Sequence, residues 1–130
     1  MSYLIDSDWL IDALAGSQRA LSLLDQLIPT EPAISAISVA EVCDGAHGAP
    51  DPALALLRVQ EFLSNYEILP VSQSVAERFA AERAMLRRRG MLIDDMDLLI
   101  AATALEHGLT MVTRNHRHFA RIPGLRIWQT

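Results

Sequence analysis

The chain has 130 residues and a formal net charge of −5, which is the size of one domain with one core and excludes a generally basic nucleic-acid binder. It begins directly with strand-like residues, and it has neither a signal-peptide pattern nor an apolar run of the roughly 18 residues that a membrane span needs. We therefore expect one domain, residues 1–130, in the cytoplasm and without membrane contact. All eleven positive residues are arginines, the type that best matches phosphate.

Short apolar runs alternate with helical patterns along the whole chain. In chain order we expect a strand at 3–5, a helix ending at 16, a helix at 18–28, a strand at 33–36, a helix starting at 38, a loop at 45–52, a helix at 53–64, a strand at 66–69, helices at 74–89 and 95–107, a strand at 109–113 and an edge strand at 125–128. Strands that alternate with helices predict an α/β fold, here a parallel sheet of about four to five strands with helices on both faces.

Polar residues follow three of the predicted strands. Asp6 follows the first strand, Glu41 lies just after the second, and Asn115 follows the strand at 109–113. Because the carboxyl ends of parallel strands meet at one edge of a sheet, these residues point to a shared site. Asp97 opens an apolar helix, and carboxylates in apolar settings need a compensating cation. An oxygen-rich cluster of this kind suits Mg²⁺ or Mn²⁺.

Each acidic residue also has a simpler structural interpretation. Asp6 can cap the helix that follows it, and Glu41 stands three residues after Ser38, which is the spacing of a capping box. The acids within 94–97 crowd a helix N-terminus, where the helix dipole favours negative charge. Their mutual repulsion would nevertheless raise their pKa values unless a cation were present. A non-catalytic RNA- or partner-binding domain is therefore the alternative to an enzyme.

A second enzyme class shares one motif with this chain. A strand followed by Asp6-Ser7-Asp8 also begins haloacid dehalogenase-type phosphatases, which hold the phosphoryl group with a later lysine. This chain has no lysine. Phosphoaspartyl chemistry therefore ranks below metal-dependent hydrolysis.

Four motifs occur in a fixed order along nearly the entire chain. They are Leu4-Ile5-Asp6-Ser7, then Ser35-x-x-Ser38-x-x-Glu41, then Asp-Leu-Leu-Ile-Ala-Ala-Thr-Ala at 97–104, and finally Val112-Thr113-Arg114-Asn115 with His118-Phe119 and Ile-Pro-Gly-Leu at 122–125. Together they resemble the PIN domain, specifically the toxin subunits of VapBC-type toxin–antitoxin modules. The segment at 97–104 is the most specific of the four.

The resemblance implies a metal-dependent endoribonuclease that hydrolyses phosphodiester bonds in RNA, with tRNA or another structured RNA as substrate. It implies Asp6 and Asp97 as the principal ligands of Mg²⁺, or of Mn²⁺, and Glu41 as the third catalytic acid. Asn115 stands where many PIN domains carry a fourth acid. Asp94 is a further neighbour, and the supporting residues expected around the site are Asp95, Asn115, Thr113 and Ser7.

The resemblance also implies macromolecular partners. A cognate VapB-type antitoxin is expected to enter the acidic site, and the chain is expected to form a homodimer. Trp9 and Leu23 on the first helices are either a surface for the antitoxin or simply part of the core. Arg114 and Arg117, on the loop after the late strand, are expected to hold RNA phosphates.

Overall fold

The computed structural model describes residues 2–129, so residues 1 and 130 of the expected domain lie outside the described residues. Within that part of the chain, no helix is both long and apolar enough to cross a membrane. The elements are β1 (Tyr3–Ile5), α1 (Ser7–Leu14), α2 (Gln18–Leu27), the 3₁₀ helix η1 (Ile28–Thr30), β2 (Ala33–Ser35), α3 (Ala36–His47), α4 (Pro52–Leu63), β3 (Glu67–Leu69), α5 (Gln73–Arg88), α6 (Asp95–His107), β4 (Thr110–Val112) and α7 (His116–Phe119).

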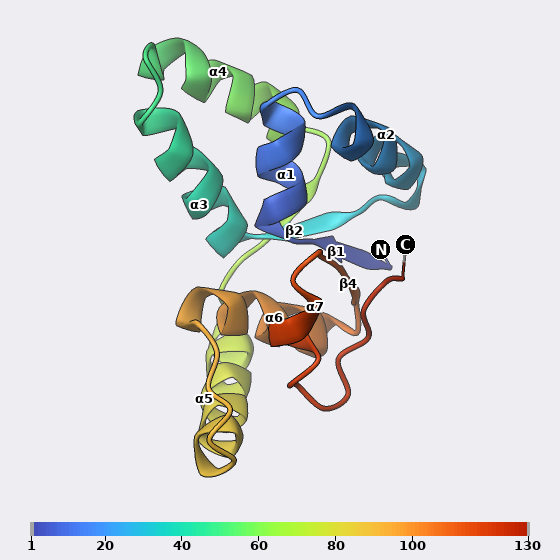
Figure 1. Ribbon diagram of the computed structural model, residues 1–130, viewed down its shortest axis with the longest axis vertical. Coiled ribbons are helices and arrows are strands. Elements are labelled where there is room, and N and C mark those ends of the chain that lie inside the picture. The colour runs from blue at the N-terminus through green and yellow to red at the C-terminus, as the bar shows by residue number, and fades with distance from the viewer. Residues whose placement is uncertain (1, 130) are drawn as a thin grey trace.

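A four-stranded sheet in the order β3-β2-β1-β4 divides the molecule into two layers. Every strand pair is parallel. Helices α1 to α4 lie on one face, and α5 to α7 lie on the other (Figure 1). The predicted fold class is therefore confirmed, because parallel neighbours require a crossover connection and these crossovers contain helices.

The strands alternate their side chains between two cores. Ile5 and Val112 belong to the core beneath α1 to α4, whereas Leu4 and Met111 belong to the core against α5 and α6. All four side chains are fully buried. A sheet that is covered on both faces needs such continuous apolar strands, which is why the short runs could be recognised in the sequence.

The start of α3 differs from the expectation. Ser35, not Ser38, is the N-cap, and its hydroxyl oxygen accepts the backbone N–H of Ile37 at 3.0 Å. Ser35 ends β2 and also caps the helix, so no linker residues separate the two elements. Ser38 is consequently a buried residue inside α3, and the capping box with Glu41 is wrong. The helix also continues to His47, so the loop predicted at 45–52 is shorter.

The expected edge strand at 125–128 is also wrong. In the C-terminal segment as described, up to residue 129, one bridge joins the chain to the sheet, between Met111 and Ile127. Met111 N–H donates to Arg126 O at 2.8 Å, and Trp128 N–H donates to Met111 O at 2.8 Å. The Thr110 N–H and the Val112 carbonyl bond to Ser2 and Asp6 on the β1 side, which leaves the backbone of Met111 to pair with this segment.

The surface expected at Trp9 and Leu23 is not exposed. Trp9 is 1% and Leu23 is 8% exposed, and both belong to the core beneath α1 to α4. Their helical spacing marked a core face, as apolar spacing on a helix usually does.

Candidate active site

Asp6 lies where β1 passes into α1. Its backbone N–H donates to Val112 O at 2.9 Å, which fixes it beside the end of β4. Carboxylate oxygen Oδ1 accepts the N–H of Ser7 at 2.8 Å, so Asp6 caps α1. Oxygen Oδ2 accepts the hydroxyl of Thr113 at 2.7 Å. The capping interpretation thus explains one oxygen, and the other links the ends of two neighbouring strands.

The surroundings of Asp6 disfavour its charge. The side chain is 5% exposed, and its pKa is raised from 3.8 to about 7, chiefly by burial. Hydrogen bonds from Thr113 and Ser7 lower the pKa, whereas the negative charges of Asp8 and Asp97 raise it. Among residues 2–129 no salt bridge joins Asp6 to a cation. Asp6 is therefore buried beside other acids, and no cation of the described residues pairs with it.

Glu41 is tied to the same place by Ser7. The Ser7 hydroxyl donates to Glu41 Oε1 at 2.7 Å and lies 2.9 Å from the hydroxyl of Ser38. Because α1 and α3 begin at the carboxyl ends of adjacent strands, these side chains meet above the sheet edge. Ser7 therefore holds one oxygen of Glu41, and its backbone N–H holds one oxygen of Asp6.

Asp97 approaches from the first turn of α6. Its Oδ2 lies 3.4 Å from Asn115 Nδ2 and 3.1 Å from His118 Nδ1. The latter two nitrogens are 2.9 Å apart. Nδ1 of the imidazole cannot donate to Asp97 and accept from Asn115 with the same tautomer, so one of the two hydrogen bonds forms at a time. His118 thus belongs to the site, and the short helix α7 that carries it was missed in the sequence.

Asp8 is a further site residue that the sequence interpretation passed over. Its Oδ2 accepts the backbone N–H of Arg114 at 3.0 Å and lies 3.5 Å from the Thr113 hydroxyl. Its charge contributes to the raised pKa of Asp6. The sequence signal for Asp8 is the Asp6-Ser7-Asp8 spacing, a motif that phosphatases of the haloacid dehalogenase type share.

The remaining expected residues lie outside this cluster. Asp95 pairs with Arg83 at 3.0 Å. Asp94 caps α6 by accepting the backbone N–H groups of Met96 and Asp97 at 3.1 and 3.3 Å. Of the three acids within 94–97, Asp97 is thus the one that reaches the site.

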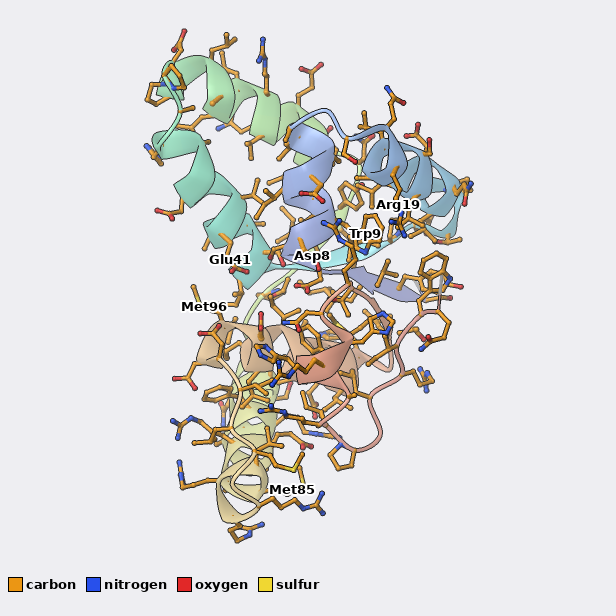
Figure 2. The ribbon with its side chains drawn as sticks, in the orientation of Figure 1. Asp8, Trp9, Arg19, Glu41, Met85 and Met96 are labelled. Atoms are coloured by element: carbon orange, nitrogen blue, oxygen red, sulfur yellow. The ribbon has the colours of Figure 1, made fainter. Side chains whose placement is uncertain are left out.

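A hollow of about 500 Å³ borders the acidic cluster. Glu41 on α3 and Met96 on α6 lie on two of its sides (Figure 2). Ile11 on α1 completes the wall toward the first helix. The site is therefore open to a ligand that is larger than a single ion.

The donor set fits a hard divalent cation held by few protein ligands. Within residues 2–129, no three Asp, Glu, His or Cys side chains converge as a ready-made metal cage. Mg²⁺ does not need one, because it keeps several waters and commonly takes one or two carboxylates together with substrate phosphates. Asp97 is close enough to Asp6 for its charge to contribute to the raised pKa of Asp6. A divalent cation would supply the counter-charge that Asp6 lacks.

Comparisons with known proteins show the family to which the chain is similar. The family model described as PIN domain matches residues 3–125. The tRNA(fMet)-specific endonuclease VapC of Salmonella typhimurium is 31% identical, with 98% of this chain and 96% of that protein covered. Ribonuclease VapC2 of Haemophilus influenzae is also 31% identical, with 97% and 96% covered. The crystal structure of DNA-bound VapBC from Salmonella typhimurium contains a chain that superposes with a TM-score of 0.91 at 29% identity and covers 98% of this chain and 97% of that chain.

Proposed function

This chain belongs to the PIN-domain family, among the VapC proteins, and we propose that it is a Mg²⁺-dependent endoribonuclease toxin. Its substrate in this proposal is tRNA or another structured RNA, and a cognate VapB-type antitoxin neutralises it in the cytoplasm. The observation that carries the proposal is the buried Asp6 carboxylate, whose pKa is raised to about 7 at the edge where Glu41 and Asp97 also arrive. Burying such an unneutralised charge costs stability, and a metal-binding role accounts for that cost.

Asp6 and Asp97 would hold the metal, and Glu41 would complete the acidic pocket. Mg²⁺, or Mn²⁺ in its place, supplies Lewis-acid stabilisation of the phosphate charge and lowers the pKa of water. Thr113 and the Ser7 N–H keep the Asp6 oxygens in place. Asn115 contributes an amide hydrogen bond to Asp97 and no negative charge of its own.

The proposed reaction is hydrolysis by water. A water oxygen forms a bond to phosphorus, the bond from phosphorus to the 3′ oxygen breaks, and the 3′ oxygen takes a proton from solvent. Glu41 or Asp97 accepts the proton that the attacking water loses. Because water is the nucleophile and the bond to the 3′ oxygen is the one that breaks, the products carry 5′-phosphate and 3′-hydroxyl ends. No side chain of the protein forms a covalent intermediate in this proposal.

The chemistry of the product ends tests this function. We expect the purified, antitoxin-free chain to cut total tRNA in Mg²⁺ into discrete fragments with 5′-phosphate ends, because water is the nucleophile. Fragment ends are identified by their susceptibility to a 5′-phosphate-dependent exonuclease. An Asp97→Asn preparation, purified in parallel, reveals any contaminating nuclease. Wild-type-specific 2′,3′-cyclic phosphates would contradict the mechanism, and no cleavage by a folded chain would favour the non-catalytic alternative.

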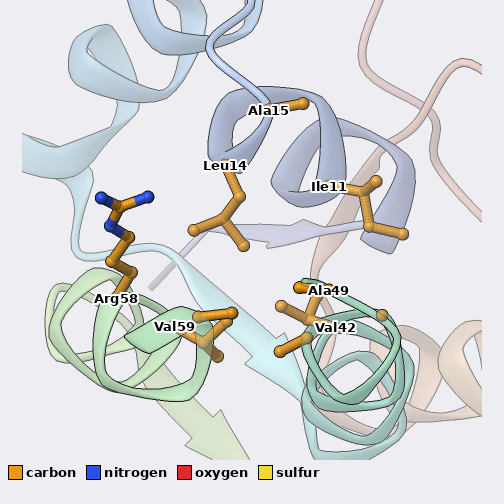
Figure 3. Close-up of a pocket in the computed structure, with 10 residues that line it drawn as sticks. Ile11, Leu14, Ala15, Val42, Ala49, Arg58 and Val59 are labelled. Atoms are coloured by element: carbon orange, nitrogen blue, oxygen red, sulfur yellow. The ribbon is translucent and has the colours of Figure 1, made fainter. Parts of the chain in front are cut away.

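An apolar groove supports the proposed antitoxin partner. It encloses about 360 Å³ between α1, α3 and α4, with Ile11 and Leu14 facing Val42 and Val59 and with Arg58 at one end (Figure 3). Ile11 lines this groove and also the hollow beside Glu41. A helix or strand that fills the groove would therefore continue toward the acidic site, where a basic side chain could replace the metal.

The proposal includes a homodimer of this chain.

Ile11→Asp is expected to weaken antitoxin binding by about tenfold or more, because it places a charge in the centre of an apolar contact. Ile11 is 47% exposed, so the substitution leaves the core intact. Leu57→Asp is the matched control, since Leu57 is 63% exposed on α4 and lies outside the groove. Affinity for the cognate antitoxin, measured by titration, should fall for Ile11→Asp alone. Equal affinities of the two variants would place the antitoxin elsewhere.

A further inference from the structure

Arg114 lies between two residues that hold the acidic site. Thr113 precedes it and donates its hydroxyl to Asp6, and Asn115 follows it and donates its amide to Asp97. We propose that Arg114 is a positioning residue, which clamps the loop after β4 onto α1 and so keeps both partners against the metal-binding carboxylates. This inference rests on the proposed function, because it assigns Arg114 a role in assembling that same site.

The Arg114 guanidinium makes three contacts with α1. Its Nη2 forms an ion pair with Asp12 and donates to the backbone O of Asp8 at 3.3 Å. The guanidinium carbon lies 4.5 Å from the centroid of the Trp9 ring, a cation–π distance. A planar guanidinium can stack on a ring and donate from its edge at the same time, which an ammonium group cannot do equally well.

The surface that receives Arg114 is rigid. Trp9 is 1% exposed and belongs to the core beneath α1 to α4, so its ring cannot move without disturbing that core. Asp8 and Asp12 are one helical turn apart on α1, and the backbone N–H of Arg114 also donates to Asp8 Oδ2 at 3.0 Å. The loop is thus fixed to α1 through both its backbone and its side chain.

The clamp acts at the junction of the two halves of the site. Thr113 Oγ1 accepts the backbone N–H of Asn115 at 3.0 Å, so a shift of the loop would move both residues together. Asp6 lies on the α1 side of the sheet edge, whereas Asp97 comes from α6 on the other face. Thr113 and Asn115 bridge these carboxylates, and Arg114 fixes the bridge to α1.

The same contacts separate Arg114 from Arg117. We expected both residues to hold RNA phosphates, but the charge of Arg114 is already paired with Asp12. Both arginines are exposed, but no hydrogen bond or ion pair joins the Arg117 side chain to the rest of residues 2–129. The geometry therefore predicts that Arg114 governs metal affinity and that Arg117 governs RNA affinity.

Two measurements on Arg114→Ala and Arg117→Ala separate these roles. The first is the Mg²⁺ concentration that gives half-maximal thermal stabilisation, and the second is the affinity for total tRNA in EDTA. We expect Arg114→Ala to raise the Mg²⁺ midpoint about tenfold, the size of effect that residues supporting metal ligands have, and to leave tRNA affinity within about threefold of wild type. Arg117→Ala should weaken tRNA binding in a salt-dependent way and leave the Mg²⁺ midpoint unchanged.

Asp12→Asn is a second variant for which the two possible roles of Arg114, positioning the metal site and binding RNA, predict different results. It breaks the ion pair but removes a negative charge, so RNA binding should stay equal or strengthen, whereas the Mg²⁺ midpoint should rise as in Arg114→Ala. A wild-type Mg²⁺ midpoint in Asp12→Asn or in a folded Arg114→Ala would overturn the inference and leave the proposed function intact. If the wild-type chain neither binds Mg²⁺ nor cleaves RNA, the proposed function fails and this inference fails with it.

Discussion

Asp97→Asn is expected to reduce Mg²⁺-dependent RNA cleavage by more than roughly 100-fold, since loss of a residue that merely supports a metal ligand already costs 10- to 100-fold. The substitution removes one of the two carboxylates proposed to hold the metal. The fold should tolerate it, because an Asn oxygen can still accept a hydrogen bond from Asn115 or His118, the two partners of Asp97.

Cleavage rates at saturating Mg²⁺, together with tRNA affinity in EDTA, check this result. Glu106→Gln is the matched control, because Glu106 lies on the same helix and pairs with Arg78 at 3.4 Å, far from the sheet edge. It removes the same charge and should leave the cleavage rate within about threefold. If Asp97→Asn retained wild-type activity, Asp97 would not be a metal ligand.

Asp6→Asn should make the metal-free protein more stable near neutral pH while it abolishes metal binding. The pKa of Asp6 is raised from 3.8 to about 7 in the folded state, so folding favours the protonated form. The stability associated with the protonated Asp6 side chain is fully present below about pH 4 and is lost as the pH rises toward 7. About three units at roughly 1.4 kcal/mol each correspond to a penalty on the order of 4 kcal/mol above pH 7.

The neutral Asn side chain avoids this penalty. Its oxygen can accept the N–H of Ser7, and its amide can donate to Thr113, whose own hydroxyl then turns toward Asp8 Oδ2 at 3.5 Å. Urea unfolding in EDTA should therefore show Asp6→Asn more stable than wild type at about pH 8 and similar to it near pH 4.

Mg²⁺ should reverse the order at the higher pH. A ligand that binds only the folded state raises the free energy of unfolding by mass action, and this gain should occur for wild type and not for Asp6→Asn. Glu106→Gln should respond to Mg²⁺ as wild type does. An Asp6→Asn variant no more stable than wild type at about pH 8 would mean that Asp6 is not an unneutralised buried charge in the folded chain.

The sheet and the convergence of polar residues at its edge were predictable because both follow from local patterns. Strands buried on both faces appear as short apolar runs, and the rule for parallel strands then brings the residues after each strand together. These two rules were sufficient to predict that Asp6 and Glu41 lie at the same edge of the sheet. Ser35 was harder to interpret, because a residue that ends a strand and caps the next helix leaves no separate signal for either role.

The loop after β4 could not be derived in this way. The helix α7 has four residues, which is too short to show a helical period. The sequence pattern therefore did not predict that His118 contacts Asp97. The direction of Arg114 depends on Trp9 and Asp12, about one hundred residues earlier in the chain. Contacts of this separation are set by packing, and an exposed-looking arginine in a loop gives no sign of them.

The Mg²⁺ dependence of RNA cleavage by the antitoxin-free chain tests the central claim most directly. The rate is measured on total tRNA as Mg²⁺ is added, then after excess EDTA, and again after Mg²⁺ is restored. We predict that cleavage rises to saturation, stops in EDTA and returns, because the carboxylates of Asp6 and Asp97 act through the ion that they bind. Cleavage at the same rate in EDTA would contradict a metal-dependent site at this edge of the sheet.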